Sequence, residues 1–264
     1  MADRVNIQSH GAVAEVRLAR PDKLNALDEA MFAALAEAGE KLAAAPGVRA
    51  IVLSGEGKAF CAGLDRSLFQ TLAGGKGQDL LAGSRTPEGA NPLQQAMMVW
   101  RNAPVPVIAA VQGAAFGGGL QLALAADMRI AAPDAQLSAM EIKWGIIPDL
   151  GGIGMLRRLV RDDVLRDLVF TGRVVDAPEA LDLGLVTRLA DDPRAIALSA
   201  AEEIAARSPD AIRAAKALIN CAADAPLADL LGYESALQAS LIGRSNQIEA
   251  VMANLQARPA RFAD

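Results

Sequence analysis

The stretch Ala115-Phe116-Gly117-Gly118-Gly119-Leu120-Gln121-Leu122 joins an apolar run, Val105 to Val111, to a segment with helical character, Gly118 to Ala125. Three glycines where a buried strand gives way to a helix leave backbone N–H groups exposed, because no side chain keeps a ligand away. The positive end of the helix dipole lies at the same point, so the motif can hold a phosphate or a developing oxyanion. The glycines also suit close packing of helix on strand, and the motif alone does not separate these interpretations.

A second loop has the same features. Residues 55–65, with the sequence GEGKAFCAGLD, run from a short buried strand into a helical turn that begins at Leu64. N–H donors from two such junctions can converge on one carbonyl oxygen, and removing one donor of this kind costs about 3–4 kcal/mol of transition-state stabilisation. The first loop lacks the G-x-G-x-x-G spacing and the chain has no P-loop, so a nucleotide site is not indicated.

The order of the predicted elements defines the fold class. Strands and helices alternate from Arg4 to Ser138, including a helix that Asp28 caps and that ends near Ala44. From Gly152 onward the pattern is almost entirely helical, and its last helix is predicted to run from Leu227 to Leu255. This order predicts an α/β fold with a parallel-type core and a C-terminal helical part, and the character of the sequence changes near residue 190.

Composition argues against several classes of function. Of the 264 residues, 52% are hydrophobic and 3% are aromatic, so a packed aliphatic core is expected. A net charge of −5 without a basic run argues against a nucleic-acid partner. No apolar run approaches the roughly 20 residues of a membrane span, and the N-terminal segment does not read as a signal or transit peptide. Two distant cysteines, Cys61 and Cys221, argue against a disulfide framework and predict a cytoplasmic protein.

The single histidine, His10, narrows the possible mechanisms. It stands between two short alternating runs and is predicted to lie in a hairpin turn that faces solvent. A Ser-His-Asp or Cys-His mechanism then has no base. With one histidine and no cysteine pair at zinc spacing, no metal site is expected. Cys61 fits a small buried apolar residue better than a nucleophile.

Five motifs, taken together in their order and spacing, carry a family resemblance that covers nearly the whole chain. The sequence resembles the crotonase, or enoyl-CoA hydratase/isomerase, superfamily in the segments RPDKLNAL at 20–27, KAFCAGLD at 58–65, GAAFGGG at 113–119, FTGR at 170–173 and ALDLGLV at 180–186. The whole set is specific, whereas any one segment alone is not.

This resemblance implies a coenzyme A thioester substrate, with coenzyme A as part of the substrate and no separate cofactor, and a place in fatty acid metabolism. It implies that the N–H groups of Ala62 and Gly118 form the oxyanion hole for a thioester enolate. Lys23, Leu24 and the loop Ala62, Gly63, Leu64 and Asp65 would lie along the coenzyme A. The expected fold is a spiral of ββα units over residues 1–190. Residues 191–264 are expected to form a helical part that trimerises, giving a homotrimer or a dimer of trimers.

An oxyanion hole needs a proton carrier beside the reacting carbon. The resemblance implies that hydratases of this family place two glutamates at the positions of Gln121 and Glu141. Gln121 is an amide and cannot take up a proton at pH 7, so this departure argues against efficient hydration. Asp149 stands eight residues after Glu141, a gap that matches the acid pair of dienoyl-CoA isomerases, although those enzymes usually carry an aspartate at the position of Gln121.

These residues favour an enoyl-CoA isomerase that moves a double bond with Glu141 as acid and base. The first alternative is a 2-enoyl-CoA hydratase in which Glu141 and Asp149 share the water. A further alternative is an oligomer that binds coenzyme A thioesters without catalysis. Each site residue also has a structural interpretation: Glu141 in a first helical turn, Asp149 as an N-cap, and Gln121 as a packed helical residue.

Overall fold

Two sheets form the centre of the molecule. The computed structural model describes residues 4–71, 81–223 and 225–264, so residues 72–80 of the loop that glycine content predicts at 71–91 lie outside the described residues. The six-stranded sheet has the order β1-β2-β3-β4-β6-β9, with β1 (Val5–His10), β2 (Val13–Leu18), β3 (Ala50–Gly55), β4 (Val107–Val111), β6 (Met128–Ala131) and β9 (Arg188–Leu189). Its strands are parallel except for the antiparallel hairpin β1–β2. The second sheet is β5 (Ala114–Phe116), β7 (Gln136–Ser138) and β8 (Val175–Asp176).

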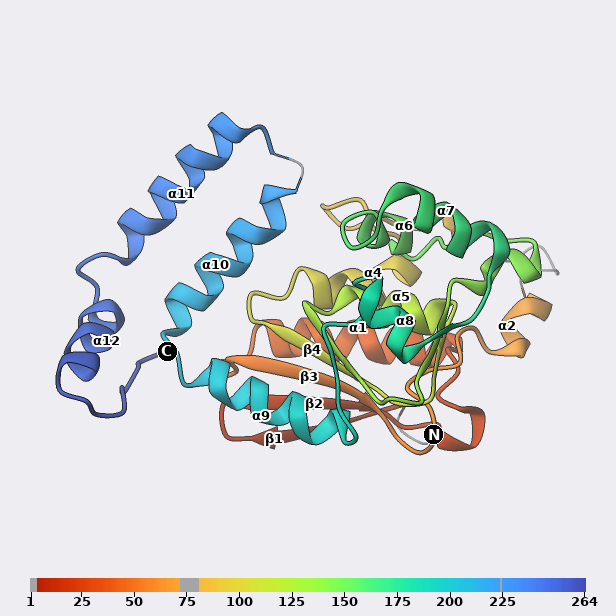
Figure 1. Ribbon diagram of the computed structural model, residues 1–264, viewed down its shortest axis with the longest axis horizontal. Coiled ribbons are helices and arrows are strands. Elements are labelled where there is room, and N and C mark those ends of the chain that lie inside the picture. Colours follow the sequence, from red (N-terminus) through yellow and green to blue (C-terminus); the bar gives the residue numbers. More distant parts are fainter. Residues whose placement is uncertain (1–3, 72–80, 224) are drawn as a thin grey trace.

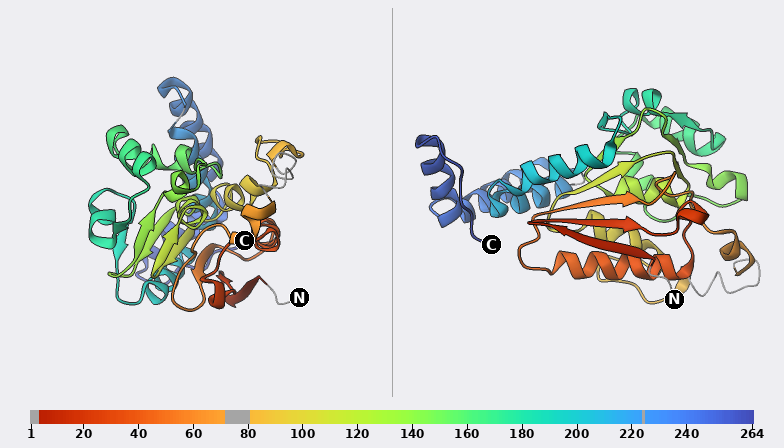
Figure 2. Two further views of the ribbon diagram at one scale, coloured as in Figure 1. Left: turned by 90° about the vertical axis from the view of Figure 1, so that its right-hand side faces the viewer. Right: turned by 90° about the horizontal axis from the view of Figure 1, so that it is seen from below.

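Both faces of the six-stranded sheet are covered, which explains why β3 and β4 read as continuous apolar runs. Helices α1 (Glu29–Ala43), α4 (Pro92–Arg101) and α5 (Gly118–Ala125) bury the larger core on one face. Helix α9 (Pro193–Ala205) packs its small side chains Ala197, Ala201 and Ala205 on the other face (Figure 2). Alternate residues of each strand point to opposite faces, as the period of two in a strand requires. The predicted α/β fold is confirmed.

The remaining elements surround this core or extend from it. They are η1 (Pro21–Lys23), α2 (Arg66–Thr71), η3 (Met140–Trp144), α6 (Gly152–Leu156), α7 (Asp162–Thr171), α8 (Ala177–Asp182), α10 (Pro209–Ala222), α11 (Leu227–Leu241) and α12 (Ser245–Leu255). Helices α10, α11 and α12 extend away from the sheets as an arm (Figure 1). No residue of α11 is buried. Among the described residues, no helix combines the length and apolarity that crossing a membrane requires.

Three details of the sequence prediction are wrong. The helix predicted over 227–255 is two helices, because the chain turns at Gly243, whose φ of +76° suits a residue without a side chain. His10 is the last residue of β1 and pairs with Val13, so the hairpin turn is made by Gly11 and Ala12. Three short strands were not predicted: β5, which has three residues, and β8 and β9, which have two residues each. Such short strands carry too few residues to show a periodic pattern.

The loop before α1 is fixed by the buried side chain of Asn25. Its Oδ1 accepts a hydrogen bond from the Arg20 N–H at 2.9 Å, and its Nδ2 donates to the carbonyls of Glu56 and Ala59, both at 2.9 Å. Asn25 also has a φ of +56°, a left-handed conformation that asparagine tolerates better than most residues. One side chain thereby fastens the loop at 20–27 to the loop at 55–65.

Replacing Asn25 with Ala should lower the free energy of unfolding by about 3 kcal/mol, because two buried carbonyls and one N–H lose their partner. Urea denaturation of the variant and of the unmodified protein measures the difference. Asn6→Ala is the control, since the exposed Asn6 side chain donates to the Glu56 carboxylate at 2.8 Å. Its loss should be less than about 0.5 kcal/mol. Equal losses in the two variants would show that Asn25 does not hold the loop.

Candidate functional site

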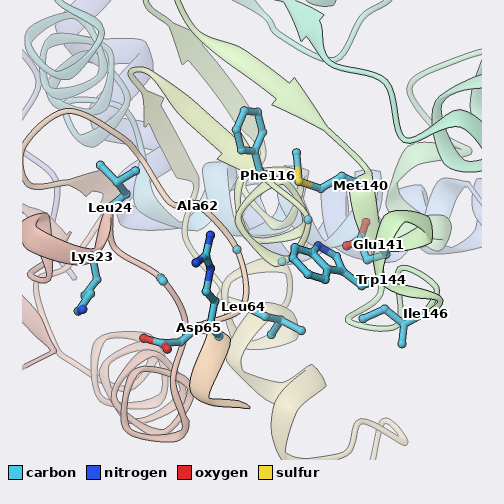
Figure 3. Close-up of a pocket in the computed structure, with 15 residues that line it drawn as sticks. Lys23, Leu24, Ala62, Leu64, Asp65, Phe116, Met140, Glu141, Trp144 and Ile146 are labelled. Carbon is cyan, nitrogen blue, oxygen red and sulfur yellow. The ribbon is translucent and has the colours of Figure 1, made fainter. Parts of the chain in front are cut away.

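One cavity of about 450 Å³ collects most of the residues that the sequence analysis singled out. It lies between the loop before α1, the loop after β3, the junction of β5 with α5, and η3 (Figure 3). Its lining includes Lys23, Leu24, residues 62–65, Gly118 and Glu141, but neither Gln121 nor Asp149. Four residues that were not assigned to the site from the sequence, Phe116, Met140, Arg66 and Ile146, line the cavity together with Trp144.

The two glycine-containing loops lie side by side. One follows β3, and the other is the junction of β5 with α5. Cys61 and Ala115 form a parallel bridge, in which the Cys61 N–H donates to Ala114 at 3.0 Å and the Phe116 N–H donates to Cys61 at 3.0 Å. At Gly63, with φ +89°, a Cβ atom would lie 2.5 Å from the Phe116 carbonyl oxygen and 3.6 Å from the Gly118 nitrogen. Glycine is therefore required at 63 for this approach of the two loops.

The backbone N–H groups of the two loops differ in their availability. The Ala62 N–H donates to the Leu24 carbonyl at 2.9 Å, so it is engaged within the chain. Leu64 forms a parallel bridge with Leu27, in which the Leu27 N–H donates to the Gly63 carbonyl and the Leu27 carbonyl accepts from the Asp65 N–H. Leu64 lies between the two residues that make these bonds. In a parallel bridge the N–H of such a residue points away from the partner strand, so the Leu64 N–H points away from Leu27.

Gly118 supplies an N–H group at the other side of this approach. It is the first residue of α5, whose N-cap is Gly117 at φ +51°. The first-turn N–H groups of a helix have no partner within the helix, and they lie at its positive end. Gly118 lines the cavity, whereas the neighbouring Gly119 packs directly against the Cys61 carbonyl.

Glu141 presents a buried carboxyl group at the cavity (Figure 3). It belongs to η3 and its side chain is 5% exposed. Its Oε1 accepts a hydrogen bond from Gln121 Nε2 at 2.7 Å, while its buried Oε2 has no hydrogen-bond partner among the described residues. Burial raises the pKa of the Glu141 carboxyl, and the negative charge of Asp149 raises that pKa further. A buried carboxyl with a raised pKa at a cavity is typical of a group that exchanges protons with a ligand.

Gln121 lies behind Glu141 and does not face the cavity. Its side chain is 2% exposed, and its Oε1 accepts hydrogen bonds from the N–H groups of Leu150 and Gly152, each at 2.9 Å. A backbone N–H can only donate, so these two bonds fix which end of the amide is oxygen. The Nε2 group must then face Glu141, as the 2.7 Å contact shows.

Asp149 is half-buried beside this group. Burial raises the pKa of its carboxyl, and its main-chain carbonyl accepts a hydrogen bond from Gln94 Nε2 at 2.9 Å. The N-cap of α6 is Gly151, in a left-handed conformation and without a side-chain cap, so the interpretation of Asp149 as an N-cap is wrong. Its charge acts on Glu141, but its side chain is not part of the cavity lining.

Two exposed cationic side chains and one ion-paired carboxylate also line the cavity. Lys23 and Arg66 line it, and Asp65 forms an ion pair with Arg20 at 2.9 Å. Hydrogen bonding, first from the Ser67 N–H and also from Arg20, lowers the pKa of Asp65 to about 2. Asp65 therefore stays ionised and fixes the loop, while the two cationic side chains beside it suit a ligand that carries phosphate.

Cys61 is a structural residue. Its thiol is fully buried and donates to the Asn25 carbonyl at 3.1 Å, and burial raises its pKa to about 12. A thiol of this kind is not a nucleophile, which agrees with the sequence interpretation. Within residues 4–71, 81–223 and 225–264, the carboxylates, cysteines and His10 form no cluster of three or more that could hold a metal ion.

Comparison with known proteins identifies the family. The family model described as enoyl-CoA hydratase/isomerase matches residues 8–264. A probable enoyl-CoA hydratase of Rhizobium meliloti (strain 1021) is 37% identical over 263 residues, covering 97% of this chain and 96% of that protein. The mitochondrial Delta(3,5)-Delta(2,4)-dienoyl-CoA isomerase of Homo sapiens is 32% identical over 250 residues, covering 92% of this chain and 76% of that protein.

The fold gives the same result. The crystal structure of an enoyl-CoA hydratase from Polaromonas sp. JS666 matches with a TM-score of 0.90 at 31% identity, covering 98% of this chain and 99% of that one. The chain belongs to the enoyl-CoA hydratase/isomerase, or crotonase, family and is an acyl-CoA enzyme of that family. The names of these relatives include both hydratase and isomerase, with hydratase the more frequent.

Proposed function

We propose that this enzyme is an enoyl-CoA isomerase that moves a double bond between the 3- and 2-positions of an acyl-CoA, with Glu141 as the only acid and base. The observation that carries this proposal is the hydrogen bonding of Gln121. Its oxygen is bound by two backbone N–H groups, its nitrogen donates to Glu141, and it is not part of the cavity lining, so it is not placed to hold a water in the cavity. Of the carboxylates lining the described cavity, Asp65 is held by Arg20 and Ser67, which leaves Glu141 for proton transfer.

The oxyanion hole in this proposal consists of the N–H groups of Gly118 and Leu64. This replaces the pair Gly118 and Ala62 inferred from the sequence, because the Ala62 N–H is already bonded to Leu24. Two N–H donors directed at the thioester oxygen stabilise the enolate as its charge develops. The coenzyme A portion would then lie along Lys23, Leu24 and residues 62–65.

The reaction balances with one carboxylate. Glu141 takes the proton from C2 of a 3-enoyl-CoA, and the electrons of the C2–H bond move to the thioester oxygen as a dienolate. The dienolate then takes the proton at C4, the C2–C3 bond becomes double, and Glu141 is a carboxylate again. No water is consumed and nothing is oxidised or reduced.

Hydration of a 2-enoyl-CoA by Glu141 and Asp149 is the second candidate. It is supported by the hydratase names of most relatives and by the effect of the Asp149 charge on the pKa of Glu141. It requires the Asp149 carboxylate to reach a water in the cavity, although Asp149 is not part of the cavity lining. For this reason isomerisation is the first choice.

Two further properties are proposals as well. A homotrimer, or a dimer of trimers, is supported by α11, which has no buried residue and carries exposed Leu227, Leu231 and Tyr233. Such apolar surface is stabilised when another chain covers it. A cytoplasmic location is supported by Cys61 and Cys221, which are both free thiols.

The proposal is tested by incubating the protein with a 2-enoyl-CoA and, separately, a 3-enoyl-CoA in heavy water and following the mass of each. Interconversion of the two esters with deuterium uptake and no added water is the expected result. Rapid gain of one water by the 2-enoyl ester would instead establish the hydratase. Binding of both esters without any change of mass would support the non-catalytic alternative.

A further inference from the structure

The amide of Gln121 makes the two oxygens of Glu141 unequal. Oε1 accepts a hydrogen bond from Gln121 Nε2 at 2.7 Å, whereas Oε2 is buried without a partner among the described residues. The orientation of the amide is not free, because the N–H groups of Leu150 and Gly152 both require its oxygen. The close approach of the amide to this segment requires glycine at 152, since a Cβ atom there would lie 2.6 Å from Gln121 Oε1.

This arrangement decides where a proton on Glu141 resides. When the carboxyl group is protonated, one oxygen becomes a hydroxyl and the other a carbonyl. The carbonyl oxygen is the better acceptor, so the donor Gln121 Nε2 keeps Oε1 as the carbonyl. The hydroxyl proton is then on Oε2.

We infer that Gln121 is a positioning residue that reserves Oε1 of Glu141 as a permanent hydrogen-bond acceptor and assigns all proton exchange to Oε2. The catalytic part of this inference rests on the proposed function. In that reaction, the proton taken from C2 and the proton returned to C4 would both reside on Oε2 of Glu141. A glutamate at position 121 could not do this, since an ionised carboxylate has no proton to donate to Oε1.

The infrared spectrum of the protonated Glu141 carboxyl tests this inference without relying on activity. A pH-dependent difference spectrum of the protein, compared with that of Glu141→Gln, identifies the C=O band of Glu141. Gln121→Met keeps the length of the side chain and removes the donor. The C=O band should then move to higher wavenumber, because a carbonyl that accepts no hydrogen bond is stiffer. Gln112→Met is the control, since Gln112 Nε2 donates to the Gly55 carbonyl outside the cavity.

Two further readouts separate positioning from a merely structural role. Because the Gln121 hydrogen bond favours the carboxylate form, Gln121→Met should raise the pKa of Glu141 and move the acidic limb of the kcat profile to higher pH. Loss of one hydrogen bond to a charged group should lower kcat about 10- to 100-fold, with KM nearly unchanged. A variant that is only less stable would lose activity without moving the limb.

Gln121→Glu provides a second variant if Gln121→Met does not fold. It can still accept both backbone N–H bonds, and it places two carboxyl groups in contact. The pair should titrate in two steps, in contrast to the single step of Glu141 alone. An unmoved C=O band in Gln121→Met, or an unchanged single step in Gln121→Glu, would overturn the inference. A moved band in a protein that does not isomerise enoyl-CoA would leave the inference intact and refute the proposed reaction.

Discussion

Glu141→Gln should lower the rate of double-bond movement by about 10³-fold or more, because it removes the group that we propose as the proton carrier. Glutamine has nearly the same shape as glutamate. Its side-chain oxygen can accept the Gln121 hydrogen bond that Glu141 Oε1 accepts at 2.7 Å, so the cavity should keep its form. Measurement of kcat and of the dissociation constant for an acyl-CoA separates chemistry from binding, and only kcat should change.

The control for this variant is Glu37→Gln, on the exposed face of α1. It makes the same chemical change far from the described cavity lining and should retain full activity. Retention of activity within tenfold in Glu141→Gln would contradict the assignment. Asp149→Asn would then be the next variant, because the Asp149 carboxyl is the neighbouring group whose charge acts on Glu141.

The raised pKa of Glu141 also links activity and stability to pH. The native pKa of Glu141 lies above the ordinary value of 4.5, so the carboxylate that would act as a base forms only at higher pH. The activity should therefore rise as the pH passes through this raised pKa. In the same window the native state binds more protons than the unfolded state, so the contribution of Glu141 to stability falls as pH increases. Glu141→Gln should therefore be more stable than the unmodified protein at neutral pH, and this difference should disappear below the ordinary pKa. Thermal unfolding at several pH values measures it.

The sequence predicts the fold well where local signals are strong. Apolar runs bounded by turns give β3 and β4, Asp28 caps α1 through its bond to the Met31 N–H at 2.8 Å, and α5 begins at Gly118 as expected. It predicts poorly where a single residue determines the path of the backbone. At Gly243, a left-handed φ divides the predicted last helix into α11 and α12. Strands as short as β8 and β9 exist because neighbouring strands pair with them, and local sequence does not record this.

The site, like the fold, could be predicted from the sequence only in part. The family resemblance pointed to Glu141 as the proton carrier and the glycine-containing loops suggested the oxyanion donors, and the structure brings Glu141 and both loops to one cavity. The sequence could not show whether the Ala62 N–H is free to act as a donor, because this depends on the position of the Leu24 carbonyl, to which that N–H is bonded. The hydrogen bonding of Gln121 was equally hidden, since the N–H groups of Leu150 and Gly152 that hold it lie at the start of α6, about 30 residues further along the chain.

Gly63→Ala is expected to lower kcat by about 10²- to 10³-fold, which is the range for loss of one oxyanion donor. A Cβ atom at 63 would lie 2.5 Å from the Phe116 carbonyl oxygen, so the loop that carries Leu64 must move away from the loop that carries Gly118. The N–H groups of Leu64 and Gly118, which we propose as the oxyanion donors, would then no longer converge on one oxygen. Steady-state kinetics and acyl-CoA binding measure the effect, which should fall mainly on kcat.

The chain supplies a matched control in Gly89. Its φ of +90° is almost the same as the +89° of Gly63, but apart from its two chain neighbours no atom of the described residues lies within 4 Å of the position that its Cβ would occupy. Both alanine variants should lose about 1–2 kcal/mol of stability, because both force a side chain into the left-handed region. Only Gly63→Ala should lose kcat, since only there does the new methyl group meet the second loop. Equal kcat values in the two variants would mean that the approach of these loops does not form the oxyanion hole, and that the enolate is stabilised elsewhere in the cavity.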